Sequence, residues 1–175
     1  YYDNGVRKIL IEDSATNVIL GSDFQNWGII RSGASVSSNI YPAPNNTNEA
    51  VLIDLGSNTD GRATTGSGGG TVLSVYLKKH ENDPNGTFPI AENINGVYEK
   101  TLLNLTDEWQ RFYVYSPNLN NGNAGFSRQG NSNDEETLTR AYAWGIQSET
   151  GTKATSYIPN TFSNGTSTRT ADTLQ

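Results

Sequence analysis

The stretch TVLSVYLKK, residues 71–79, carries the clearest structural pattern in the chain. Its residues alternate between two faces of an extended segment, with Leu73, Val75 and Leu77 on one face and Ser74, Tyr76 and Lys78 on the other. Successive side chains of a strand point to opposite faces, so this period of two predicts a β-strand with one face in an apolar core.

Similar short segments recur on both sides of this stretch. We expect strands at residues 6–12, 17–20, 49–55, 98–105, 109–116, 138–147 and 155–158. Turn-forming residues separate them at 42–46, 57–70, 83–86 and 118–133, and the second and fourth of these predict long surface loops. Asn, Thr, Ser and Gly supply 74 of the 175 residues, which disfavours helices. The pattern predicts one antiparallel β-sandwich domain over residues 1–175, with 160–175 as a linker or edge segment.

Charge and hydropathy exclude several classes of partner. The net charge of −6 disfavours nucleic-acid binding, which needs clustered Lys and Arg. No run approaches 18 apolar residues, so we expect no insertion in a membrane. There is no cysteine for a disulfide or a thiolate metal site. The chain begins at Tyr1 and has no methionine, so we expect a piece of a longer polypeptide.

Catalytic groups are scarce. The acidic run at 134–136 places adjacent carboxylates on a polar loop, where they are expected to be solvated and not to converge on one bond. His80 is the only histidine and follows Lys78 and Lys79 before a polar turn, so we expect it at the surface. The sequence therefore predicts a protein that is not an enzyme.

Calcium is the one metal that the composition favours, because it takes oxygen ligands from Asp, Asn and carbonyl groups in irregular loops. Asp60, Asp83 and Asp134 are the candidate ligands for one structural calcium ion. They do not have the spacing of an EF-hand loop.

Aromatic residues are numerous, and their positions allow two interpretations. Each of Trp27, Trp109 and Trp144 lies in a strand-like segment, which favours a place in the core. Tyr76 lies opposite the apolar face of its strand, and Trp109, Arg111, Tyr113 and Tyr115 share one parity. Sugars stack on aromatic rings and hydrogen-bond to polar side chains. The candidate carbohydrate-binding residues are Tyr76, Arg111, Tyr113 and Tyr98.

Seven motifs occur in the order found in a known group of proteins. They are ILIEDSATNV at 9–18, GSDFQNW at 21–27, SVYLK at 74–78, EWQRF at 108–112, AWGIQ at 143–147, TSYIP at 155–159 and TRTAD at 168–172. Across nearly the whole chain, the sequence resembles a family of bacteriophage tail, fibre and head-associated domains.

The resemblance implies an antiparallel jelly-roll β-sandwich of the carbohydrate-binding-module type (galactose-binding or concanavalin-like), placed on the virion surface and so extracellular. Related modules hold a structural calcium through an acidic residue in a late strand, and the corresponding Ala143-Trp144-Gly145 has none. The resemblance transfers no sugar-binding residues.

Three functions stay open at this point. The first is a non-catalytic module that binds a polysaccharide or cell-surface glycan for host adhesion. The second is a structural or decorating virion domain without tight sugar binding. The third is an accessory module of a polysaccharide-degrading enzyme. Either virion role is compatible with a homo-oligomer, commonly a trimer on a fibre.

Overall fold

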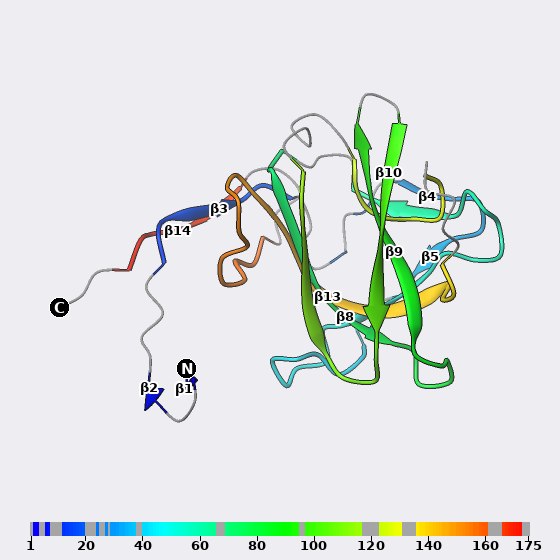
Figure 1. The fold of residues 1–175 in the computed structure, drawn as a ribbon, viewed down its shortest axis with the longest axis horizontal. Coiled ribbons are helices and arrows are strands. Elements are labelled where there is room, and N and C mark those ends of the chain that lie inside the picture. Colours follow the sequence, from blue (N-terminus) through cyan, green and yellow to red (C-terminus); the bar gives the residue numbers. More distant parts are fainter. Residues whose placement is uncertain are drawn as a thin grey trace.

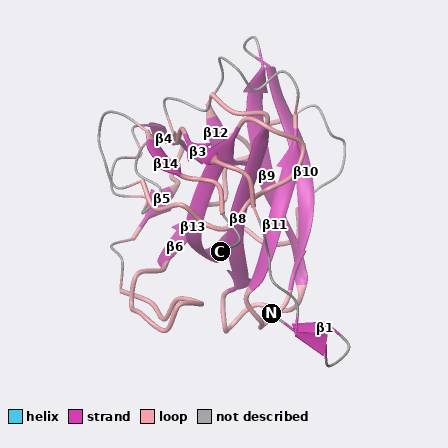
Figure 2. Ribbon diagram, turned by 90° about the vertical axis from the view of Figure 1, so that its left-hand side faces the viewer, coloured by secondary structure: helices cyan, strands magenta, loops and turns pink. Residues whose placement is uncertain are grey.

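Two antiparallel sheets form the body of the molecule (Figures 1 and 2). The computed structural model describes residues 2–3, 6–7, 12–19, 24, 27, 29–37, 40–65, 69–94, 97–116, 123–130, 136–160 and 166–172. The first sheet has the order β10 (Val97–Leu105), β9 (Gly86–Ile94), β12 (Ala124–Ser127), β7 (Arg62–Thr64), β4 (Ile29–Arg31). The second has the order β11 (Gln110–Tyr115), β8 (Val72–Lys79), β13 (Arg140–Glu149), β6 (Val51–Asp54), β5 (Ser35–Val36).

Two short strand pairs lie outside these sheets. β1 (Tyr2–Asp3) pairs with β2 (Val6–Arg7), and β3 (Ala15–Asn17) pairs with β14 (Ser167–Arg169). Figure 1 shows β3 and β14 beside the sandwich, to the left of β13 and β8. Over the described ranges no residue is helical, and so no helix there has the length and hydropathy to span a membrane.

The core lies between the two sheets. The alternation in β8 predicted its inner face correctly, since Leu73, Val75 and Leu77 are fully buried. They pack in one cluster with residues of the first sheet, among them Phe88 and Phe126. Trp27 joins this cluster and stacks on Phe126 at 5.7 Å between ring centroids, as expected for a core tryptophan. The all-β sandwich predicted from the sequence is therefore confirmed.

The two segments expected to be surface loops contain buried strands. β12 lies within the expected loop 118–133 and forms the middle of the first sheet. β7 lies within 57–70 and pairs with both β12 and β4. Small residues let these strands pack closely. They resemble loops in sequence because β7 has no large apolar side chain and β12 has only Phe126.

Other expected elements differ from the structure. β9, β4 and β5 were not anticipated, and residues 155–158 form no strand. Within the segment from 160 to 175, β14 pairs with β3, so this described part is an edge segment and not a linker.

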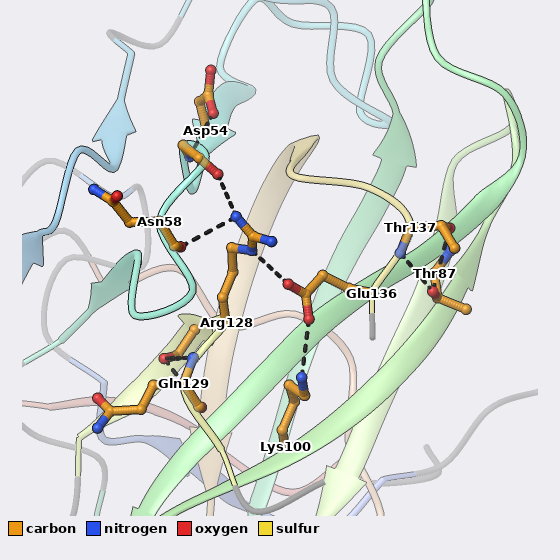
Figure 3. A network of polar contacts seen from close by, with 10 residues as sticks. Asp54, Asn58, Thr87, Lys100, Arg128, Gln129, Glu136 and Thr137 are labelled. Carbon is orange, nitrogen blue, oxygen red and sulfur yellow. Dashed lines mark hydrogen bonds and ion pairs between the residues drawn. The ribbon is translucent and has the colours of Figure 1, made fainter. Parts of the chain in front are cut away.

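An ion-pair network joins β10 to the segment after β12 and the segment before β13 (Figure 3). The Glu136 carboxylate accepts hydrogen bonds from Lys100 of β10 and from Arg128, which follows β12. Only 5% of the Glu136 side chain is exposed, which corrects the expectation that the acidic run is solvated. The other two residues of that run lie outside the described residues.

Candidate functional site

The second sheet presents one face to the core and the other outward. Phe112 and Val114 of β11 pack against the core. Arg111, Tyr113 and Tyr115 alternate with them along the strand and therefore face the other way. We call this side of the second sheet the outer face. The strand register places Arg111 opposite Tyr76 and Tyr113 opposite Ser74, and Tyr76 in turn lies opposite Trp144.

Aromatic rings cover the middle of the outer face. Tyr76 and Trp144 lie 5.3 Å apart between ring centroids, and Tyr157 lies 4.7 Å from Trp144 on its other side. The Arg111 guanidinium lies 5.4 Å from the centre of the Tyr76 ring, within range of a cation–π interaction. Four side chains thus form one continuous surface across three strands and the segment after β13.

A β-bulge shapes this surface. The register between β13 and β8 shifts between Trp144 and Gln147, and Gly145 within the bulge has a φ of +62°. A Cβ at Gly145 would lie 3.3 Å from the Tyr157 ring, so glycine permits both the backbone turn and the close approach of that ring.

Two tyrosines at the edge of the outer face are open to solvent. Tyr113 is 59% exposed and Tyr115 is 51% exposed, although both lie on a regular strand. Exposed tyrosines next to a packed aromatic surface are available for stacking with a ligand.

A pocket of about 340 Å³ lies at one end of the outer face. Its lining residues are Tyr41, Pro42, Lys78, Glu81, Trp109 and Tyr142. Tyr41 packs on Tyr142 at 4.7 Å between centroids, and His80 stacks on the same ring at 5.5 Å. His80 is 8% exposed, so the surface position expected for it is wrong, because it packs beneath Tyr142.

Polar contacts fix the groups around the pocket. Tyr142 donates a hydrogen bond to Glu81, and this bond lowers the pKa of the Glu81 carboxyl. Burial, together with the same bond, raises the pKa of Tyr142. Arg140 holds both oxygens of Asp83 at 2.9 Å, and these hydrogen bonds lower the pKa of Asp83.

Glu49, which precedes β6, also has donors. Asn45 donates a hydrogen bond to its carboxylate at 3.1 Å, and this bond, with smaller contributions from Thr47 and Trp144, lowers the pKa of Glu49.

Three of the four predicted carbohydrate-binding residues come together. Tyr76, Arg111 and Tyr113 share the outer face on neighbouring strands. Tyr98 belongs to β10 in the first sheet, opposite Asn93, so the structure separates it from the other three; its side chain lies outside the described residues.

Sequence reasoning missed two tryptophans of this face. Trp109 lines the pocket and Trp144 lies on the aromatic surface, so the core position expected for both is wrong. The signal was present in β13, where Ala141 and Ala143 alternate with Tyr142 and Trp144. The small residues face the core and the large aromatic residues face outward.

The predicted calcium ligands do not form a cluster in the described residues. Asp60 is exposed and accepts a hydrogen bond from Ser32 at 2.8 Å. Asp83 is held by Arg140, and Asp134 lies outside the described residues. Within the ranges that the structure covers, no three acidic or histidine side chains converge as metal ligands. Calcium binding stays a prediction.

Comparison with known proteins identifies the fold. No protein-family model matches the sequence, and no curated protein matches it. One similar solved structure contains the CBM22-1 and GH10 modules of endo-1,4-β-D-xylanase 10B from Clostridium thermocellum, complexed with xylohexaose. It has a TM-score of 0.52 and 13% identity over 87% of this chain and 30% of that chain.

A second similar structure is the CBM22-1 xylan-binding domain from Paenibacillus barcinonensis, with a TM-score of 0.48 and 14% identity over 77% of this chain and 89% of that one. At such identities only the fold is shared. The chain is therefore an antiparallel jelly-roll β-sandwich of the type found in carbohydrate-binding modules.

Proposed function

We propose that this chain is a carbohydrate-binding module and that the glycan binds across the outer face. The observation that carries the proposal is the continuous surface of Tyr76, Trp144, Tyr157 and Arg111, with the exposed Tyr113 on the same sheet face. Aromatic rings offer apolar faces to the CH groups of a sugar, and the arginine offers donors to its hydroxyl groups. The similar structure of the CBM22-1 and GH10 modules complexed with xylohexaose is consistent with this function.

The proposed activity is binding without catalysis. Glu136 is the one described carboxylate of the acidic run, and Lys100 and Arg128 hold it in a buried ion-pair network. A carboxylate held as an anion by two cations is a poor proton donor, which supports a role in stability.

We further propose that the module belongs to a phage virion protein and contributes to host adhesion. The support is the ordered set of seven sequence motifs. A shallow site on a sheet face buries little sugar surface, so each copy binds weakly. Many copies on one particle then give useful attachment through avidity.

Affinity electrophoresis tests the proposal. The purified domain is run through gels that contain a panel of neutral and acidic polysaccharides, with calcium and with a chelator, and the release of reducing sugar is measured in parallel. Retardation by a glycan without release of reducing sugar is the expected result. No retardation by any polymer contradicts the proposal and favours the structural virion role.

Replacement of Tyr113 locates the site. Tyr113→Ala removes an exposed ring from the outer face, and we expect at least about fivefold weaker glycan binding with an unchanged melting temperature. Ile30→Ala is the matched control, because Ile30 is 41% exposed on β4 of the other sheet. Unchanged affinity in Tyr113→Ala removes this residue from the site.

A further inference from the structure

Two cationic side chains are diagonal neighbours on the outer face. Arg111 of β11 lies opposite Tyr76 of β8, and Lys78 lies two residues further along β8 on the same face. Diagonal neighbours of this kind have Cα atoms about 7–8 Å apart. Long side chains such as lysine and arginine can therefore reach one ligand together.

Neither cation is paired with an acid among the described residues. Arg111 donates one hydrogen bond, from Nη2 to Ser74 Oγ at 3.0 Å, and its buried Nε has no partner in the structure. Lys78 is half-buried in the wall of the pocket, between Trp109 and Tyr142, and makes no ion pair within the described part of the chain. Both side chains therefore retain donors for a ligand.

The acids near this face already have donors. Tyr142 donates to Glu81, Arg140 holds Asp83, and Asn45 donates to Glu49. Glu81 lines the pocket together with Lys78, but its carboxylate already has Tyr142 as a donor. The acids near the outer face are therefore satisfied, whereas Lys78 and Arg111 have no acid partner among the described residues.

Four other half-buried cations have carboxylate partners, namely Lys100, Arg128, Arg140 and Arg169, in a chain where acidic residues outnumber Lys and Arg by 18 to 12. Arg62 instead donates to the Gln129 side chain, and the buried Lys79 makes no ion pair among the described residues. Withdrawing a cation from water without a partner is unfavourable, and an anionic ligand offsets that cost. The two unpaired cations therefore point to an anion in the bound ligand.

We propose that the glycan bound at the outer face carries carboxylate groups, as uronic acid residues do, and that Lys78 and Arg111 bind those groups. This inference rests on the proposed carbohydrate binding and adds the chemical class of the ligand. The aromatic rings bind the sugar faces, while the two cations select polymers in which a carboxylate lies beside a stacked ring.

The test uses matched pairs of polymers. Affinity electrophoresis is run with polygalacturonate, alginate and hyaluronan, each beside its carboxyl-reduced form, and with dextran sulfate beside dextran. We expect at least one uronate polymer to bind about tenfold more tightly than its reduced form and to lose affinity as salt is raised. We expect dextran sulfate to bind no better than dextran.

Variants of Lys78 test whether this side chain causes the preference for uronate polymers. Lys78→Gln is expected to remove most of the preference for the uronate polymer, and Lys78→Arg is expected to keep it. Arg31→Gln removes the same charge from β4 of the other sheet and is expected to keep the preference. Thermal unfolding of each variant confirms that the domain is folded.

Each contrary result has a distinct meaning. Equal binding of both members of every uronate pair overturns the carboxylate assignment and leaves carbohydrate binding in place. A preference that survives in Lys78→Gln overturns the assigned residue. Equal or stronger preference for dextran sulfate indicates general polyanion binding and overturns the uronate class. Binding to no polymer, charged or neutral, overturns the proposed function itself.

Discussion

The Glu136 side chain links strand β10 to the segment after β12. Burial acts to raise the pKa of its carboxyl, but hydrogen bonds from Arg128 and Lys100 outweigh that effect, and the pKa lies below its usual value. Lys100 is as buried as Glu136, with 5% of each side chain exposed. Loss of the carboxylate therefore leaves two cations poorly solvated.

Glu136→Gln is expected to lower the free energy of unfolding at pH 7 by about 3–5 kcal/mol. Because folding lowers the pKa of Glu136, its contribution is complete above the unfolded value of about 4.3 and is lost as the pH falls through the folded pKa. Urea unfolding at pH 7 and pH 3 checks both points. The variant should lose less stability on acidification than the parent; Glu99→Gln, at an exposed position of β10, is the control.

The residues of the candidate site were predictable where the alternation of side chains along a strand decides which face each one occupies. Tyr76, Arg111 and Tyr113 follow from the alternation in two strands, and the register confirms that they share a face. The position of Trp109 and Trp144 in strand-like segments favoured a place in the core, yet their parity places them on the outer face. Tyr41 lies outside the named strands, in a single bridge to Ala50, so only the tertiary structure brings it to the pocket.

At the scale of elements, β12 is the strand that local sequence describes least well. Its residues are AGFS, and all four are buried in the middle of the first sheet. A Cβ at Gly125 would lie 2.5 Å from the carbonyl oxygen of Ala63 and 2.9 Å from the Trp27 ring. The small residues of β12 resemble those of a turn, but close packing requires them. A search for alternating large apolar residues does not detect such a strand.

Gly125→Ala is expected to destabilise the domain by about 1–3 kcal/mol, because the backbone of β7 and the ring of Trp27 must move to admit the methyl group. Gly69→Ala is the matched control, since a Cβ there meets only Val18 at an ordinary 3.6 Å. Chemical denaturation of both variants compares their free energies of unfolding. Similar stability of the two would contradict the packing described for β12.

The longer strands were the best predicted elements. β8 and β11 were expected within one residue at each end, because each has a regular alternation and clear turn residues beside it. β9 was missed because Gly86 and Pro89 interrupt its pattern. A strand of this kind is stabilised by pairing with β10 along its whole length, which is information that its own sequence does not contain.

At the scale of the whole molecule, Asn17 ties segments from distant parts of the chain. It is fully buried, donates to the Ile158 carbonyl at 2.8 Å and accepts from the Ser148 amide at 3.1 Å. Asn160 reinforces the junction by donating to the carbonyl of Ile19 at 2.9 Å. One side chain thus joins the segment after β3, strand β13 and the chain that leads to β14.

Asn17→Ala is expected to cost about 2–4 kcal/mol, because it leaves buried backbone groups of β13 and of the later segment without partners. Urea unfolding followed by tryptophan fluorescence measures the change. Asn104→Ala, at an exposed position of β10, is the control and is expected to change stability by about 0.5 kcal/mol or less. A loss no larger than that of the control would contradict the role given to Asn17.

Oxygen atoms of three residues surround the Arg128 guanidinium. Its Nη1 donates to the carbonyl oxygens of Gly56 and Asn58 at 2.9 and 3.2 Å, while its Nε is held by Glu136. Backbone carbonyls and a carboxylate around one positive centre are also the oxygen ligands that a bound Ca²⁺ ion gathers. Here the positive centre is covalently part of the chain, so it has no dissociation equilibrium with the medium. A chelator cannot extract it and dilution cannot empty it, so the arrangement of these oxygen atoms does not depend on the concentration of free calcium.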